Sequence, residues 1–346
     1  MKPLIVAAIR CFLTFLVPTV AYATSAQWDL DPSSGDWNTA ANWTPNGVPN
    51  GPADVATFGL SNTTNISISA DSEVNGIVFT PAATNPYSIT VSSDRTLTLS
   101  GTGITNNSGI TERFFVGAIF PEEVGHMHFT NSATAGNAHI ECFGESSSVQ
   151  FSNRSTADSA VMLIDEGAEM NFFDRSTAGD ANIQFGISSS SINFHDASSA
   201  GSALVLGRDS IGVRVSFSHN STAGSATVAP GDTSTISFSG HSSAGSATIT
   251  GGSTGFLFFD ESSTAGSATI ICFDTEMFFF GSSKGGTAAV NLVLANGITH
   301  STLDISGHNA PGVTIGSLEG DEETFVVLGT NNLTVGSNNR APPIPA

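Results

Sequence analysis

Three aspartates recur at nearly the same place in a repeated unit, where they could form a row of carboxylates. Asp174 and Asp196 each stand two residues after a phenylalanine, and Asp260 stands one residue after another. Carboxylates gathered on one face can bind Ca²⁺ or act as a catalytic pair. Because the chain has 30 acidic residues and only 10 basic ones, a solvated acidic face is the simpler interpretation. The adjacent pairs Asp165-Glu166 and Asp260-Glu261 are interpreted in the same way.

The histidines do not form a second candidate centre. His195, His219 and His241 stand one, two and three residues after their phenylalanines. They therefore occupy three different positions of the unit and do not converge on one site. The sequence contains no nucleophile motif, phosphate-binding loop or Cys/His zinc spacing. We therefore assign no catalytic, cofactor-binding or metal-binding residue and expect a protein that is not an enzyme.

Hydroxyl side chains also recur at one position of the unit, just before its glycine. An outward array of them could bind ordered water or carbohydrate, as flat solenoid faces can. In a tight corner the same hydroxyls would instead cap the backbone, and we favour this interpretation. The positions are Thr156, Thr177, Ser199, Thr222, Ser243 and Thr264.

The unit that carries all these residues is a short phrase, STAGSATI, which is found verbatim at Ser263 to Ile270. Its glycine recurs at intervals of 22, 21, 22, 23, 21, 21 and 20 residues. A period in the low twenties is typical of one turn of a β-solenoid, which buries its apolar face only by stacking on neighbouring turns. The anchor positions are Gly136, Asp158, Gly179, Gly201, Gly224, Gly245, Gly266 and Gly286.

Apolar residues in each unit alternate with period two on both sides of the anchor, which predicts two strands with inward-facing pairs. One pair ends in a phenylalanine seven residues before the anchor; the other is an alanine and a larger apolar residue, two and four residues after it. The sequence therefore predicts a ladder of stacked rings at the ~4.8 Å spacing of strands. Its members are Phe129, Phe151, Phe172, Phe194, Phe217, Phe238, Phe259 and Phe279.

Two cysteines lie within the repeats, at one position of the unit. Cys142 and Cys272 both fall six residues after their anchors, in the first and seventh units. Six coils at ~4.8 Å would separate them by about 29 Å, far beyond the ~7 Å that a disulfide allows between Cα atoms. We expect two free thiols.

Residues 1–23 are typical of a secretory signal peptide, with Lys2 and Arg10, an apolar run and a small-x-small end at Ala21-Tyr22-Ala23. The alternative is a membrane anchor, but Arg10 shortens the apolar run below the ~20 residues of a span. Cleavage would remove two of the ten basic residues and leave eight against thirty acidic ones, a formal charge of −22. Such a chain would repel nucleic acids and anionic membrane surfaces.

The segments on either side of the repeats differ from them in composition. Residues 24–125 hold all three tryptophans and are predicted to form an N-terminal β cap with the first irregular coils; 126–295 would be the regular coils, and 296–346 degenerate coils and a tail. The stretches GDWNTAANWTPNGVP and SLEGDEETFVVLGTNNLTVGSNN resemble the start of bacterial autotransporter passengers and the autotransporter-associated β-strand repeat. The central STAGSATI-type units are similar to companions of such segments.

This resemblance implies an all-β, right-handed parallel β-helix, here of about eight regular coils of 20–23 residues, exported to the cell surface, the outer membrane or the medium. It implies an adhesive or structural role toward glycans or proteins of a host, a matrix or a neighbouring cell. It also implies a translocating β-barrel, which the sequence up to Ala346 lacks. The alternative is a carbohydrate-active β-helix enzyme, either a polysaccharide lyase or a hydrolase. Such an enzyme would need insertions that form a cleft, which the even intervals do not provide.

Overall fold

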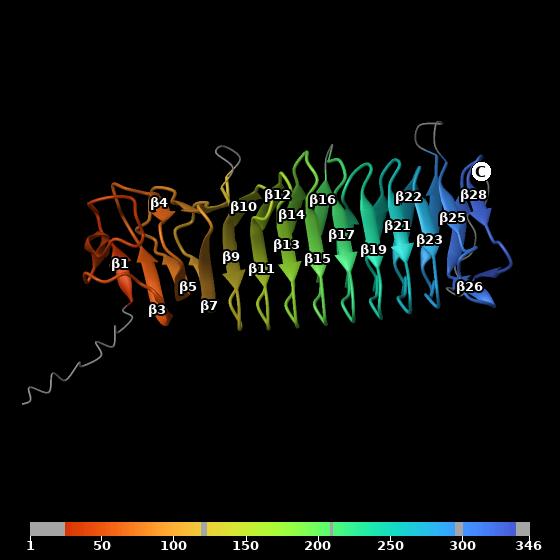
Figure 1. The fold of residues 1–346 in the computed structure, drawn as a ribbon, viewed down its shortest axis with the longest axis horizontal. Helices are drawn as coiled ribbons and strands as arrows, with labels where there is room; N and C mark the ends of the chain where they lie inside the picture. Colours follow the sequence, from red (N-terminus) through yellow and green to blue (C-terminus); the bar gives the residue numbers. More distant parts are fainter. Residues whose placement is uncertain (1–24, 119–122, 208–209, 295–299, 337–346) are drawn as a thin grey trace, which may run out of the picture.

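The computed structural model describes residues 25–118, 123–207, 210–294 and 300–336. The predicted signal peptide lies outside these residues. The described chain winds into a rod in which successive turns lie side by side along one axis (Figure 1). No helix in the described part of the chain is long and apolar enough to cross a membrane.

Two long sheets form the main walls of the rod, and their strands pair in parallel except for the antiparallel pair β1–β2. Sheet A contains, in spatial order, β2 (Trp43–Thr44), β1 (Ala26–Trp28), β3 (Gly51–Phe58), β5 (Ser72–Phe79), β7 (Arg95–Asn106), β9 (Gly125–Phe129), β11 (Ser148–Phe151), β13 (Glu169–Phe172), β15 (Ser191–Phe194), β17 (Arg214–Phe217), β19 (Thr235–Phe238), β21 (Phe256–Phe259), β23 (Glu276–Phe279), β25 (Thr302–Asp304) and β28 (Phe325–Val327). Sheet B contains β4 (Asn65–Ile68), β6 (Ser88–Val91), β8 (Arg113–Val116), β10 (His139–Phe143), β12 (Val161–Asp165), β14 (Asn182–Phe185), β16 (Leu204–Gly207), β18 (Thr227–Ala229), β20 (Thr248–Gly251), β22 (Thr269–Phe273), β24 (Ala289–Val293) and β27 (Ser317–Gly320). From β3 to β27 each coil contributes one strand to each sheet, and the three further strands of sheet A, β1, β2 and β28, lie at its two ends.

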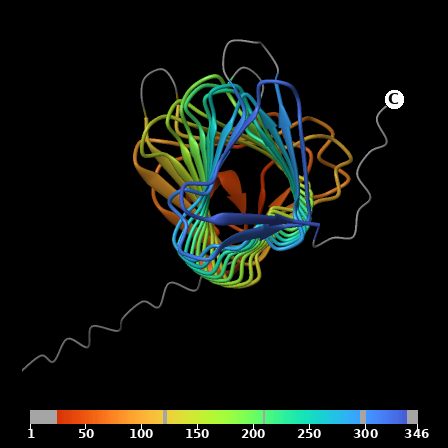
Figure 2. The ribbon, with the colours of Figure 1, turned by 90° about the vertical axis from the view of Figure 1, so that its right-hand side faces the viewer.

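A third, narrower wall closes the cross-section of the coil (Figure 2). In the regular coils it is a column of single-residue bridges that runs from Thr134 to Lys284. Toward the C-terminus it becomes a two-stranded sheet of β26 (Gly312–Ile315) and β29 (Asn332–Val335). The hydroxyl residue of the repeated phrase thus marks the third wall, and the phrase turns the chain from this wall into sheet B.

The solenoid is longer than the repeated phrase suggests. In the described residues sheet B has 12 strands, one for each turn, so the rod has about 12 turns, more than the eight regular coils predicted. The extra turns lie at both ends: β3 to β8 already pair in parallel, and β25 to β29 continue the stack after the last regular coil. The prediction fell short because these outer coils keep the strand register but lack the STAG phrase. The fold class, an all-β parallel solenoid, is as predicted.

The predicted phenylalanine ladder runs through the interior. Rings of successive coils from Phe129 to Phe279 stack with centroids 4.7–5.0 Å apart and planes within 14° of parallel. All eight rings are buried, as are the alanines that follow the anchors. Because strand pairing fixes the spacing between coils near 4.8 Å, equivalent rings of successive coils are held at a distance that suits offset stacking.

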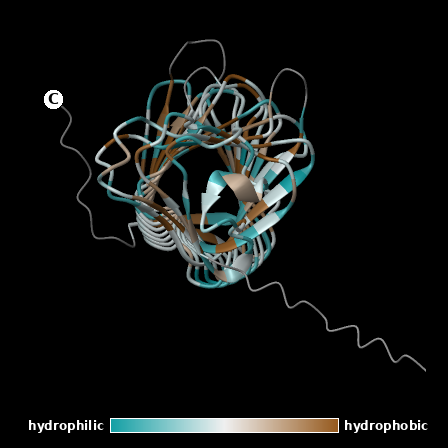
Figure 3. Cartoon of the chain, turned by 90° about the vertical axis from the view of Figure 1, so that its left-hand side faces the viewer, coloured by the Kyte–Doolittle hydropathy of each residue, from teal (hydrophilic) through white to brown (hydrophobic). Residues whose placement is uncertain are grey.

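The N-terminal end of the core is closed by tryptophans. Trp28, Trp37 and Trp43 are fully buried, and their rings lie 5.5–6.2 Å from that of Phe58, the first ring of the interior. They are carried by β1, by the loop before a 3₁₀ turn, η1 (Ala40–Asn42), and by β2. This segment lies across the end of the rod (Figure 3). It shields core residues that would otherwise face water.

Candidate functional site

The acidic row has a structural role in the corner after sheet A. The residue two positions after each ladder phenylalanine has a positive φ, a conformation that Asn, Asp and Gly adopt most readily. The side chain of one coil accepts a hydrogen bond from the backbone N–H of the coil before it: Asp174 from Asn153 (2.8 Å) and Asp196 from Asp174 (3.0 Å). Asp260 lies one residue outside this column, and Glu261 takes the corner position and accepts from Gly240. The three aspartates therefore do not converge on one centre.

The hydroxyl column caps the backbone, as we favoured from the sequence. Each Thr or Ser oxygen accepts the N–H of the anchor two residues ahead, at 2.9–3.0 Å in all seven coils from Thr134 to Thr264. The anchors themselves have φ between 53° and 63°. The phrase is therefore a corner, and the hydroxyls of this column are engaged within the scaffold.

The remaining sequence candidates do not form a site either. His195 stacks on the ring of Phe173 (4.8 Å), and its ring centroid is 6.4 Å from that of His219. Cys142 and Cys272 are free and buried, as predicted. Burial raises the pKa of the Cys272 thiol to about 12 and raises that of Cys142 as well, so both stay protonated at neutral pH.

The outward face of sheet A changes character near its C-terminal end. Phe256 and Phe258 on β21, Phe278 on β23, and Phe280 just after β23 form a cluster of nearly parallel rings outside the core. Neighbouring centroids are 5.3–5.8 Å apart, and Phe256 is 40% exposed. We call this set the outer aromatic cluster. Exposed apolar groups gathered in this way mark surfaces that bind other molecules.

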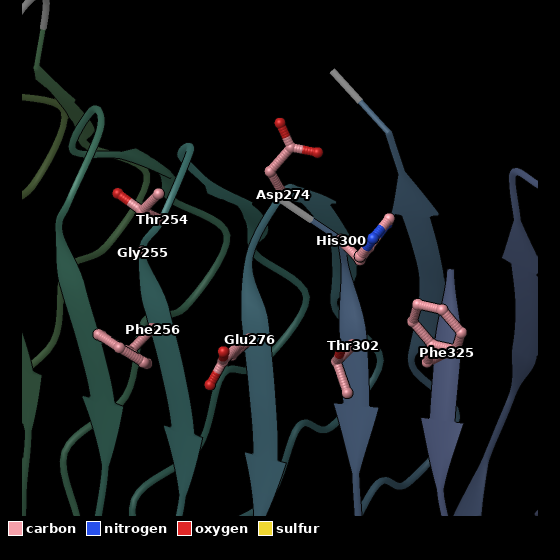
Figure 4. A pocket seen from close by; sticks show the side chains of 8 residues that line it. All are labelled: Thr254, Gly255, Phe256, Asp274, Glu276, His300, Thr302 and Phe325. Carbon is pink, nitrogen blue, oxygen red and sulfur yellow. The ribbon is translucent and has the colours of Figure 1, made fainter. Parts of the chain in front are cut away.

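A groove of about 390 Å³ begins at this cluster and crosses the face of sheet A (Figure 4). Its floor is one row of register partners, Phe256, Glu276, Thr302 and Phe325, from the four consecutive strands β21, β23, β25 and β28. Asp274 and His300 stand beside the row, with Thr254 and Gly255. We call this site the cross-strand groove.

Two exposed aromatic rings bound the cross-strand groove. Phe256 lies at one end and Phe325, 48% exposed, at the other. The His300 ring meets that of Phe325 edge to face at 5.2 Å. Glu276 is exposed, whereas Asp274 is buried at the end of β22. The site thus combines aromatic faces with carboxylates, and among its described lining residues none is Lys or Arg.

None of these groove residues was a candidate from the sequence, although two short runs carried a signal. FLFFD at 256–260 and EMFFFG at 276–281 place Phe256, Phe258 and Phe278 at positions that the earlier coils fill with polar residues. Such runs break the period-two alternation of a half-buried strand. The sequence could not show that a residue as distant as Phe325 completes the same groove, since that follows from two further turns of the solenoid.

The fold and this surface define the protein as a parallel β-solenoid that carries an aromatic, acidic groove on its outer face. Comparison with protein-family models, with curated proteins and with solved structures found no match.

Proposed function

We propose that the protein is an exported β-solenoid of the autotransporter-passenger kind, displayed at the cell surface or released, with a structural or adhesive role. The parallel solenoid and its capped N-terminal end are consistent with such a passenger. The leader-like residues 1–23 and the acidic composition support export as a dispersed protein. Its partners are proteins or glycans of a host, a matrix or a neighbouring cell.

One observation carries the adhesive role: the rod is regular and polar along most of sheet A, but presents the outer aromatic cluster and the cross-strand groove near one end. Core packing does not require Phe256, Phe258 or Phe278, because the preceding coils have polar residues at the same register positions. An exposed aromatic group that the scaffold does not need is best explained by contact with another molecule.

Export is tested by adding protease to intact cells of the organism that encodes the chain and following the protein with an antibody. We expect it to be degraded in intact cells or found in the medium, while a cytoplasmic marker stays protected. Full protection in intact cells, with degradation only after lysis, would contradict surface display. Adhesion is then tested by comparing the attachment of cells with and without the gene to matrix-coated surfaces.

A second candidate is a carbohydrate-active enzyme, favoured by the two carboxylates, Asp274 and Glu276, and His300 in one groove. Most glycoside hydrolases use a pair of carboxylates on either side of the bond that they cleave. The test is incubation of purified protein with a panel of polysaccharides and measurement of new reducing ends or unsaturated products. Activity that disappears in Glu276→Gln would establish the enzyme, and no product from any polysaccharide would leave the adhesive proposal.

A further inference from the structure

The row that forms the groove is polar in every regular coil before β21. From β11 to β19 its outward residues are Ser148, Glu169, Ser191, Arg214 and Thr235, and Phe256 is the next member. The scaffold therefore accepts a polar residue here, and the ring of Phe256 is available for a ligand. On the neighbouring strand β23, the residue paired with Phe256 is Glu276 and not another aromatic residue. The exposed ring of Phe256 therefore lies next to a carboxylate.

The charges around the groove select the kind of ligand. Glu276 stands between the two exposed rings, Asp274 lines the same groove, and Asp304 lies on the outward face of β25 beside Phe278. The whole chain carries a formal charge of −20. An aromatic face attracts a cation, and a neighbouring carboxylate adds to the attraction. Arginine suits such a site best, because its planar guanidinium stacks on rings and pairs with carboxylates.

The length of the groove fits an extended peptide. Phe256 and Phe325 are three strands apart, which is about 14 Å at the ~4.8 Å strand spacing. An extended chain rises ~3.3 Å per residue, and its alternate side chains share a face. Residues i, i+2 and i+4 of such a peptide would therefore reach Phe256, the Glu276 region and Phe325.

We propose that the cross-strand groove binds an extended basic segment of a partner protein, with arginine or lysine side chains at alternate positions. This inference rests on the proposed adhesive function and names the class of partner that the groove takes. A polyanionic glycan would be repelled by the carboxylates. A neutral glycan could hydrogen-bond to the carboxylates but carries no charge that complements theirs, whereas a guanidinium stacks on the rings and pairs with the carboxylates.

The test is a titration of purified protein against a fluorescein-labelled seven-residue peptide that alternates serine and arginine, followed by fluorescence anisotropy at low salt. In the control peptide, citrulline replaces arginine, which removes the charge and keeps the shape. Phe256→Thr places in β21 the residue that β19 already has at that position, Thr235, so the coil should fold. Glu276→Gln removes one groove charge. Glu169→Gln removes the same charge at the equivalent exposed position of β13, beside serines.

We expect the arginine peptide to bind and the citrulline peptide to bind much more weakly. Phe256→Thr should raise Kd about fivefold, as loss of a cation–π contact implies. Glu276→Gln should raise it about threefold, whereas Glu169→Gln should change it less than about 1.5-fold. Circular dichroism of each variant confirms that the solenoid is intact.

Two outcomes would overturn the proposal. Equal effects of Glu169→Gln and Glu276→Gln would mean that the peptide binds the general negative field and not the groove. Binding of neutral oligosaccharides that is lost in Phe256→Thr, with no binding of the arginine peptide, would assign the groove to a glycan instead. Because the titration uses purified protein, it can fail while surface display holds, and surface display can fail while the peptide binds.

Discussion

At the scale of single residues, Glu112 shows how a coil holds a buried carboxyl group. Its side chain is fully buried and accepts hydrogen bonds from the backbone N–H of Tyr87 (2.6 Å) and from the Ser108 hydroxyl (2.8 Å). Burial raises the pKa of Glu112 above its ordinary value of 4.5, and the two hydrogen bonds offset this only in part. The charged form is therefore a cost to the folded state.

The pH dependence of stability follows from the sign of this shift. Because the folded state binds the proton of Glu112 more tightly, its contribution is full below the unfolded pKa and is lost as pH rises through the raised folded pKa. Glu112→Gln removes the charge; its amide oxygen can still accept from the Tyr87 N–H, and its amide nitrogen can donate to the Ser108 hydroxyl oxygen in place of accepting from it. We therefore expect it to be at least as stable as wild type at pH 7. Glu112→Ala should be less stable, because it leaves the Tyr87 N–H unpaired.

Thermal melts of wild type and both variants between pH 4 and pH 8 check this. The advantage of Glu112→Gln over wild type should shrink as pH falls toward 4.5. A constant difference across this range would show that Glu112 does not titrate as burial predicts.

The two thiols give a second prediction at this scale. Both are buried and protonated, so a thiol reagent should react with neither in the folded protein and with two per mature chain after unfolding without reductant. Ellman titration with and without guanidinium measures this. Rapid labelling of the folded protein would contradict the burial of Cys142 and Cys272.

At the scale of the repeated element, stability depends on the ladder and on the glycine corner. Phe194 lies between Phe172 and Phe217, at 4.7 Å from each, so its removal opens a cavity in a closed stack. We expect Phe194→Ala to lower the free energy of unfolding by about 3–5 kcal/mol. A control at the adjacent outward residue, Asn193→Ala, should cost less than about 1 kcal/mol. Urea denaturation compares them, and similar losses would mean that the ladder does not dominate.

At Gly224 the backbones of neighbouring coils approach so closely that a side chain would clash. At Gly224, φ is 62° and an added Cβ would lie 2.5 Å from the carbonyl oxygen of Gly201 in the neighbouring coil. Gly224→Ala should therefore destabilise by at least about 1–2 kcal/mol, the cost of the left-handed conformation alone. Asp158 already occupies the same corner at φ 53°, so Asp158→Gly should be nearly neutral. Thermal melts distinguish the two, and a neutral Gly224→Ala would show that the coils can move apart.

At the scale of the whole molecule, the solenoid is a stack of nearly equivalent units. Deleting residues 225–245 joins Gly224 to Ser246 and removes one 21-residue coil while preserving the phrase. Because each coil contacts only its neighbours, we expect a folded, slightly shorter and slightly less stable rod. Deleting 225–235 alone would break the register and prevent folding. Circular dichroism and small-angle scattering compare the two, and unfolding of both would show that the stack cannot lose a coil.

The sequence by itself determined the class of the fold, its period, the inward-facing residues and the free state of the cysteines. It could do so because stacking forces every coil to place the same residue types at the same positions. The pairing register of the strands can therefore be predicted from the spacing of these residues along the chain. The corner role of Thr177 and its equivalents followed from local backbone chemistry in the same way.

Only the tertiary structure decided what depends on neighbouring turns. It extended the rod beyond the phrase, since strands such as β5 and β28 keep register without the phrase's residues. It assigned Asp174 and Asp196 to backbone N–H groups of adjacent coils, which no spacing along the chain reveals. It also brought Phe256, Glu276 and Phe325 into one groove, because residues 69 positions apart from first to last become close neighbours only when the coils stack.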